Sequence, residues 1–303
     1  MANRVYYASH AVSVGGTTIE GAQSAGITAN FTLEQAFQLG KVGIYDNIIT
    51  DAEAGMSVSK ILDGADTIFK VFTGKNQDSI ANHASTQKTV RIAANTADAD
   101  TSLQTGTQQR VQVTGAFLSS VAYNIPVDGF ATEEVSFVGD NKSVSTGVVS
   151  APTGTGTRAT YRQMISTNGF PAEVSGQNVT NISISTDFGR EAMYKLGSFD
   201  PYFRFANFPF EVSVEFTVAN TGIDETAVVL TGVTATSDGS LPAKQTITVT
   251  CTNSSGFTGS HGYVFTATGC RLSSISQDGG DTGGGNASTT YGYTTYNDLV
   301  ISG

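Results

Sequence analysis

The side chains most able to do chemistry in this sequence are two adjacent carboxylates, two thiols and a histidine. Glu133 and Glu134 resemble an acid–base pair, but neighbours on a strand point to opposite faces, so the sequence predicts two solvated charges instead. His83 lies in a polar stretch and is expected to be exposed. Cys251 and Cys270 are predicted to be free thiols, because a hairpin centred near residue 257 sets Cys251 opposite a residue near 263.

Motifs for other chemistries are incomplete. Residues 73–76 (TGKN) fail the pattern of a phosphate-binding loop, and no G-x-S-x-G nucleophile elbow occurs. The segment 278–286 is rich in Asp and Gly but lacks the alternating acidic ligands of an EF-hand. The sequence therefore predicts no catalytic residue, no metal site and no cofactor, and we expect that the protein is not an enzyme.

The composition favours strands. Of the 303 residues only 14% are charged, 34 are glycine, and β-branched residues are plentiful, which predicts an all-β protein with at most a minor short helix. No apolar run approaches the roughly 20 residues of a membrane-spanning helix, so no membrane partner is expected. The formal charge of −10 argues against tight binding to nucleic-acid phosphates, although DNA can slide past an acidic surface without sticking.

An internal repeat organises the chain. At a shift of 157 residues, segment 31–40 (FTLEQAFQLG) falls on 188–197 (FGREAMYKLG), and 88–92 falls on 245–249. The shared motif positions are Glu34, Phe37, Leu39 and Gly40 in the first copy and Glu191, Tyr194, Leu196 and Gly197 in the second. Further matches join Ile27 to Ile184 and, with small gaps, 66–74 to 224–232, 114–121 to 268–275 and 131–139 to 295–303. Matches in one order along the whole chain predict a tandem duplication.

The repeat divides the chain into two units. The first is predicted at 1–146, a Gly/Thr/Pro-rich linker at 147–160 and the second unit at 161–303. Each half carries a formal charge of −5, from 9 basic and 14 acidic residues up to residue 150 and from 7 and 12 beyond it. Each unit is predicted to be an antiparallel β-sandwich or barrel, and the motif glycines are expected to relieve tight or left-handed turns.

Residues 208–218 (FPFEVSVEFTV) show the clearest strand pattern. Apolar residues from Phe208 to Val218 alternate with polar ones, which predicts a half-buried strand with one wet, acidic face and a bulge near Asn207. The polar positions on that wet face are Glu211, Ser213, Glu215 and Thr217.

Two other elements are predicted from local patterns. Residues 111–125 form a second long strand with alternating apolar residues. A short helix is predicted at 63–72, with Asp63 as its N-cap and with Ile68, Phe69 and Phe72 facing inward.

Two segments resemble a known family. Residues 184–212, from Ile184 through Arg190, Pro201 and Arg204 to Val212, and residues 121–140 look like tail tube proteins of tailed bacteriophages. The likeness also touches 27–47, so it spans most of the chain. It implies a tube fold of two packed antiparallel sheets with a short helix. Rings of such subunits close around a β-lined channel and stack into a tube through which genomic DNA leaves.

The resemblance also implies partners and a place. It is nearest to tubes of contractile tails, which a sheath surrounds, and it implies a virion protein assembled in the host bacterial cytoplasm. Partners would be further copies of the chain, the tail sheath protein, terminator and baseplate proteins, and passing double-stranded DNA. Two tube folds per chain predict rings of three chains with pseudo-sixfold symmetry. Glu211, Ser213, Glu215 and Thr217 are then candidates for the channel lining, and the two repeat motifs are candidates for contacts between subunits.

Two alternatives belong to other classes. One is a tandem β-sandwich adhesin or receptor-binding module, which needs an exposed aromatic or metal cluster; the sequence contains no Trp. The other is a β-scaffold enzyme acting on glycosides, which needs two carboxylates about 5–10 Å apart in a cleft.

Overall fold

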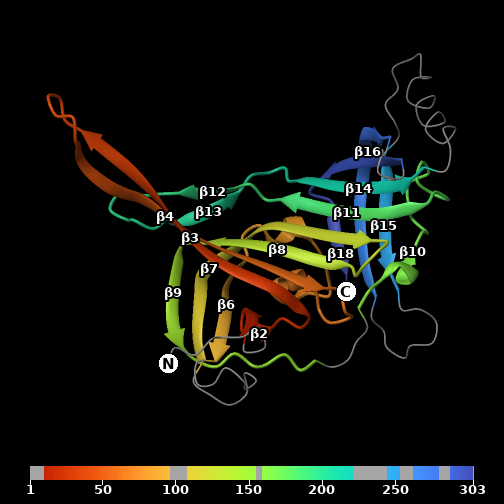
Figure 1. Ribbon diagram of the computed structural model, residues 1–303, viewed down its shortest axis with the longest axis horizontal. Coiled ribbons are helices and arrows are strands. Elements are labelled where there is room, and N and C mark those ends of the chain that lie inside the picture. The colour runs from red at the N-terminus through yellow and green to blue at the C-terminus, as the bar shows by residue number, and fades with distance from the viewer. Residues whose placement is uncertain are drawn as a thin grey trace.

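A computed structural model describes residues 10–95, 108–154, 159–220, 244–252, 262–279 and 287–302 (Figure 1). The fold is nearly all β, as the composition predicts. The first half contains β1 (His10–Val14), β2 (Thr17–Thr18), β3 (Ala22–Phe37), β4 (Ile44–Ile61), α1 (Ile68–Thr73), β5 (Gln77–Ser79), a 3-10 turn (Ile80–His83), β6 (Gln87–Asn95), β7 (Gln108–Pro126), β8 (Thr132–Gly139) and β9 (Asn141–Thr146). The second half contains a 3-10 turn (Arg162–Met164), β10 (Ile165–Ser166), β11 (Val179–Asp187), β12 (Arg190–Met193), β13 (Phe203–Ala206), β14 (Glu211–Ala219), β15 (Gln245–Cys251), β16 (Tyr263–Asp278), β17 (Ser288–Tyr296) and β18 (Leu299–Ser302).

One antiparallel ladder runs through both halves of the chain. Its strands follow the order β3–β4–β8–β7–β11–β14–β17–β16. The halves meet where β7 pairs with β11, from Ser120 opposite Asp187 to Pro126 opposite Asn181. Because the C-terminal half of β7 pairs with β8 on one side and with β11 on the other, backbone hydrogen bonds continue across this junction.

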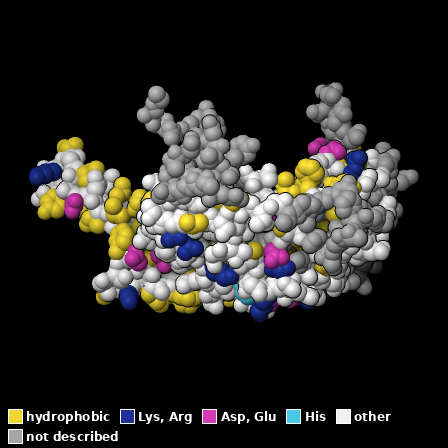
Figure 2. All heavy atoms as spheres, turned by 90° about the horizontal axis from the view of Figure 1, so that it is seen from below, with side chains coloured by type: hydrophobic (Ala, Val, Ile, Leu, Met, Phe, Trp, Pro, Cys, Tyr) yellow, Lys and Arg dark blue, Asp and Glu magenta, His cyan; other side chains and the backbone are white. Residues whose placement is uncertain are grey.

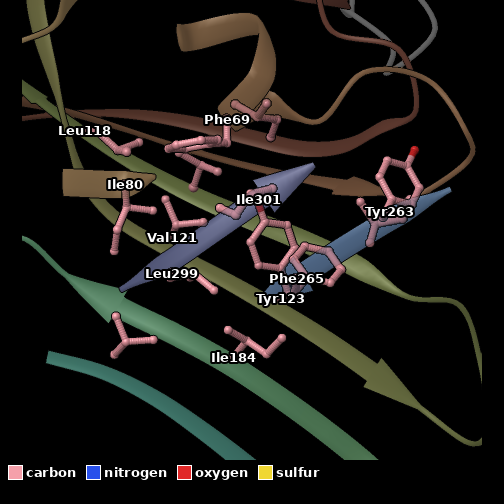
Figure 3. Packing of buried hydrophobic residues seen from close by; sticks show 14 of the residues in the cluster. Phe69, Ile80, Leu118, Val121, Tyr123, Ile184, Tyr263, Phe265, Leu299 and Ile301 are labelled. Carbon is pink, nitrogen blue, oxygen red and sulfur yellow. The ribbon is translucent and has the colours of Figure 1, made fainter. Parts of the chain in front are cut away.

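A hydrophobic core shared by both halves lies under this ladder (Figure 3). Tyr123 of β7 and Phe265 of β16 contact each other, with ring centroids 4.4 Å apart. Leu299 and Ile301 of β18 are buried in the same cluster, together with Phe69 of α1. The two predicted units therefore bury apolar surface against each other, and the predicted boundary between them stays a prediction.

The pairing order of the first half recurs in the second. In the first half the ladder β3–β4–β8–β7 continues into β6 and β1, and β9 also pairs with β7. In the second half β11–β14–β17–β16 continues into β15 and β10, and β18 also pairs with β16. Seven strands of the first half (β3, β4, β8, β7, β6, β1 and β9) thus have counterparts in the second half with the same pairing order, whereas β2 and β5 have none among the described strands.

Residue registers agree with this correspondence. The opposed residues Leu118–Phe137–Met56–Ile27 in the first half take the places of Leu272–Tyr293–Val214–Ile184 in the second. Ile27 and Ile184 therefore occupy equivalent positions, at the shift of 157 residues that the sequence predicts. The same shift relates β6 to β15, since Val90 opposes Val113 and Ile247 opposes Ala267.

Both β7 and β16 carry the same irregularity. The sequence Leu-Ser-Ser appears at 118–120 and at 272–274, and in each strand the register slips between its Leu and its second Ser. Upstream of each bulge lies a glycine with positive φ, Gly115 at 61° and Gly269 at 70°. A bulge bends and twists its strand, so these long strands turn at the same point in both halves.

One part of the sequence alignment is wrong. The sequence aligns residues 131–139 with 295–303, but the counterpart of β8 is β17, because both lie third in their ladders. The matched residues 299–302 instead form β18, the counterpart of β9. Both segments are apolar stretches that end in glycine in the sequence (SFVG and VISG), and this local similarity explains the slip.

Helix α1 is shorter than predicted. Ile68, Phe69 and Phe72 are buried, as predicted, but the N-cap is Thr67, whose hydroxyl accepts a hydrogen bond from the Lys70 N–H at 3.0 Å. Asp63 was the predicted cap. Its carboxylate instead accepts the Ala65 N–H at 3.1 Å, in the turn before the helix.

The predicted linker packs against the first half over part of its length. Val149 is buried beside Ala11 and Ala93, and its N–H donates to the Gln108 side chain at 2.6 Å. At the far end of the segment, the Thr160 N–H donates to the Leu62 carbonyl at 2.6 Å.

Candidate functional site: a polar sheet face and two hairpin arms

The four candidate lining residues lie on one face of β14. Val212, Val214, Phe216 and Val218 are buried, whereas Glu211 and Glu215 are exposed and Ser213 and Thr217 half-buried. The predicted alternation is confirmed for the strand itself. Phe208 departs from it with 58% exposure, because the strand begins only at Glu211, and the predicted bulge is instead a break between β13 and β14.

The same face continues across the whole ladder. We call it the polar face. Positions that share it are Ser24, Gly26 and Thr28 on β3; Ser57 and Ser59 on β4; Glu134 and Ser136 on β8; Ser120 and Asn124 on β7; Ser183 and Ser185 on β11; Thr290 and Gly292 on β17; and Ser274 and Ser276 on β16. Small hydroxyl-bearing residues therefore dominate the side of the sheet opposite the core.

Carboxylates are the main charges on this face. Glu134, Glu211 and Glu215 project from it, with Asp187 at the end of β11. Arg271, opposite Thr294 just before the β16 bulge, lies at its margin. The Lys60 side chain is on the other face and fully buried. Within the described strands, the polar face is thus acidic and coated with hydroxyls.

The two repeat motifs occupy equivalent hairpins. Glu34 and Phe37 lie at the end of β3 before the turn to β4; Glu191 lies in β12, and Tyr194 directly follows it before the turn to β13. Gly40 and Gly197 lie in these turns with φ of 86° and 83°, so both adopt the left-handed conformation that the sequence predicts. Leu39 and Leu196 are fully exposed beside them, at 103% and 104%.

The β3–β4 hairpin forms the long arm, residues 31–49, which projects from the body (Figure 1). Hydrophobic side chains gather along it (Figure 2). The large exposed ones are Phe31, Leu33, Phe37, Leu39, Val42, Ile44, Tyr45, Ile48 and Ile49. An apolar patch of this extent on a projecting hairpin is typical of an interaction surface.

The β12–β13 hairpin forms the short arm, residues 190–206, and it is docked on the first half. Arg204 is 1% exposed and forms ion pairs with Asp140 at 3.0 Å and with Glu53, at the base of the long arm, at 3.1 Å. Arg190 donates to the Leu118 carbonyl at 2.7 Å, and its guanidinium lies 4.9 Å from the centre of the Phe117 ring. Burial, followed by a hydrogen bond to Asp51, raises the pKa of Tyr194 to about 12.

Glu133 is fully buried, so the prediction that it is solvated is wrong. Its carboxylate accepts the Ile68 N–H at 2.6 Å, the Phe69 N–H at 3.1 Å and the Tyr123 hydroxyl at 2.9 Å. Burial raises the pKa of this carboxyl, while the two backbone donors oppose the shift. Glu134 is exposed on the polar face, so the two carboxylates do point apart, as predicted.

His83 is also buried, contrary to prediction. Its ring contacts Asp78 at 2.8 Å and Thr86 at 3.1 Å, and its edge faces Phe69 with centroids 5.9 Å apart. The Asp78 carboxylate also forms an ion pair with the Lys75 ammonium group, at 2.7 Å between Oδ2 and Nζ. This cluster of hydrogen bonds and ion pairs holds the 3-10 turn after α1 in place. The alternation of residues along a strand could not predict it, because the contacts depend on a 3-10 turn.

The cysteines are free, as predicted, and the structure shows that both are buried. Cys251 opposes Tyr263, and Cys270 opposes Gln245. Burial raises the pKa of Cys251 to about 12 and that of Cys270 to about 11. Within the described ranges, no group of three His, Cys, Asp or Glu side chains is placed to hold a metal ion.

The chain matches no family model and no curated protein in the comparisons made. Among the described residues, no helix is long and apolar enough to cross a membrane. The features that bear on function are therefore the sequence resemblance, the polar face, the two arms and the unpaired edges of β3 and β16 within the described residues.

Proposed function

We propose that the protein is a structural subunit of the inner tail tube of a tailed bacteriophage, most similar to tubes of contractile tails. The observation that carries the proposal is the repeated pairing order. Inside the chain, one half joins the other through β7 and β11. Within the described residues, the ladder ends in β3, the counterpart of β11, at one edge and in β16, the counterpart of β7, at the other. A contact that repeats head to tail closes into a ring when its rotation allows.

The polar face suits the lining of a DNA channel. Its carboxylates repel phosphates, and its hydroxyls offer no cation that holds them. Glu211, Ser213, Glu215 and Thr217 are the proposed lining residues of β14, and Ser185 of β11 and Glu134 of β8 lie on the same face.

Ring size follows from strand number. Each chain contributes the eight strands of the ladder, so three chains contribute 24. Strands about 4.8 Å apart give a circumference of roughly 115 Å and a backbone diameter near 37 Å, larger with strand tilt. Such a channel passes duplex DNA, which fits a three-chain ring with pseudo-sixfold symmetry.

In this role the protein is part of the virion, assembled in the host cytoplasm. Its partners are copies of itself, the tail sheath protein, and terminator and baseplate proteins, with double-stranded DNA in transit and no cofactor. Electron microscopy of the concentrated protein tests the proposal. We expect filaments with a central hole, whose rings contain three chains and show pseudo-sixfold density. Solid particles or persistent monomers would contradict it.

A further inference from the structure

Inside the chain, the β7–β11 junction shows how one half attaches to the next. Val121 opposes Thr186, Ala122 opposes Ser185 and Tyr123 opposes Ile184. The apolar residues at this junction are nearly inaccessible: Val121 is 1% and Ile184 2% exposed. The junction therefore combines backbone pairing with a closed apolar layer.

The counterparts of these two strands are the ends of the ladder. Among the described residues, β3 pairs with β4 alone, and residues 271–276 of β16 pair with β17 alone. Ile27 and Ile275, the counterparts of Ile184 and Val121, are only partly buried. Each edge thus exposes the apolar position that the internal junction covers.

Neither edge is protected against pairing. Natural proteins block free edges with charges or proline. Residues 22–30 of β3 read AQSAGITAN, and residues 272–276 of β16 read LSSIS, without a charge or a proline in either. Unprotected edges of this length are expected to be covered by another strand.

We propose that β16 of one copy pairs antiparallel with β3 of a second copy in the register of the internal junction. This inference rests on the proposed function and specifies its subunit contact. Replacing each residue of the β7–β11 junction by its counterpart sets Ser274 opposite Asn30, Ile275 opposite Ala29 and Ser276 opposite Thr28. The polar face then continues from copy to copy, since Ser276 and Thr28 are exposed on it, and Ile275 meets the apolar side.

Side chains at the base of the long arm fit the same placement. At the internal junction, Arg190 of the short arm covers Phe117 of β7. Their counterparts are Leu33 of the long arm and Arg271 of β16. The arginine belongs to the arm at the internal junction and to the edge strand at the proposed junction. Each junction therefore pairs one arginine side chain with one apolar side chain. The long arm, exposed in the single chain, then lies on the second half of the neighbouring copy.

Paired cysteines test the register. In Thr28→Cys/Ser276→Cys, mild oxidation of assembled protein should link neighbouring copies and convert most of the chain into a covalent species of about 95 kDa, three times the 31.5 kDa chain. The matched offset variant Thr28→Cys/Ser274→Cys should link at least tenfold less. Native Cys251 and Cys270 are buried and do not compete.

The internal counterpart supplies the positive control. Ala122 opposes Ser185, so Ala122→Cys/Ser185→Cys should lose its thiols without a change in mass. Suppose that filaments assemble and that the control forms its disulfide, while Thr28→Cys/Ser276→Cys stays uncrosslinked. The proposed β16–β3 register is then wrong, and the proposed tail-tube function is not contradicted. If neither the wild type nor any variant assembles, the proposed function fails and the inference with it.

Discussion

At the scale of residues, the buried polar groups serve to fix α1 on the sheet. Glu133 closes the N-terminus of α1 and binds Tyr123 of β7, so one carboxylate joins three elements. Its parity was visible in the sequence, because Glu133 is in phase with the buried Val135 and Phe137. A charge on a core-facing position is a signal of a buried hydrogen-bonded group, since an unpaired charge there is too costly.

Removing this carboxylate should destabilise the fold. Glu133→Ala leaves two buried backbone N–H groups and one buried hydroxyl without an acceptor, and each such orphaned group costs about 1–3 kcal/mol. Urea unfolding should show a loss of at least this size. The neighbouring Glu134→Ala removes an exposed carboxylate and should change the free energy of unfolding by less than about 0.5 kcal/mol. Equal effects of the two variants would contradict the assigned role.

The Asp78 cluster should make stability depend on acid pH. Hydrogen bonding to Lys75, supported by Asn82 and His83, holds the pKa of Asp78 well below its usual range. In the unfolded chain Asp78 takes up a proton near pH 4, so its stabilising effect is complete above that pH and declines as the pH falls.

Urea unfolding between about pH 6 and pH 2.5 measures this effect. Wild type should lose more free energy of unfolding over this range than Asp78→Asn, whose side chain does not titrate. The exposed Asp200→Asn should follow the wild-type curve. Parallel curves for wild type and Asp78→Asn would show that the ion pair adds no stability.

At the scale of elements, the two arms carry most of the large exposed hydrophobic side chains of the described residues. Leu39 and Leu196 lie at the two tips and touch little of the chain. Leu39→Ser/Leu196→Ser should therefore leave urea unfolding unchanged within about 0.5 kcal/mol. We expect it to reduce filament length at least severalfold by weakening contacts between copies of the chain.

Val148→Ser provides the control for the arm variant, because Val148 is 78% exposed but lies on neither arm. Sedimentation and negative-stain microscopy give the length distributions. Unchanged filaments in the arm variant would show that the arm tips do not contribute to contacts between copies.

Strand patterns predicted elements well where one face is buried and the other wet. Alternation of apolar and polar residues predicted β14, and hairpin register predicted that the two cysteines do not oppose each other. Turn chemistry predicted the left-handed glycines of both arms. The pattern failed at ends. Phe208 continues the alternation, yet the strand begins three residues later, after Pro209, which has no N–H to donate to a ladder. Periodicity records the spacing of side chains and not the point at which pairing starts.

At the scale of the whole molecule, charge on the polar face should decide how DNA passes through the proposed tube. Glu211→Lys/Glu215→Lys changes the charge by +4 on each chain, on the face proposed as lining. We expect assembled tubes of this variant to retain duplex DNA at about 50 mM salt and to release it at higher salt, whereas wild type retains none. Fluorescence anisotropy of labelled DNA measures the retention.

The same charge change away from the polar face is the control. Asp128→Lys/Asp200→Lys alters two exposed positions outside the ladder strands. Tubes of this control should resemble wild type in DNA retention. If both variants retain DNA equally, the charges act from the outer surface and the polar face is not the lining.

The correspondence between the pairing orders of the two halves could be anticipated from the sequence where turns and core positions keep the same residue types. Gly40 and Gly197 hold the same left-handed turn, and Ile27 and Ile184 the same place in the ladder. How the halves join was not accessible. β7 pairs with β11, a strand of the other half, and the residue pattern of neither strand determines which strand it pairs with.

The β7–β11 junction also has a kinetic consequence. Because both of its strands belong to one polypeptide, this contact forms at a rate that does not depend on protein concentration, and it costs no translational freedom of a separate body. In a closed ring of three such chains, half of the six seams are therefore made in advance by covalent continuity. Nucleation of a ring then requires the encounter of three molecules rather than six, so its rate falls less steeply on dilution than that of a ring assembled from single units.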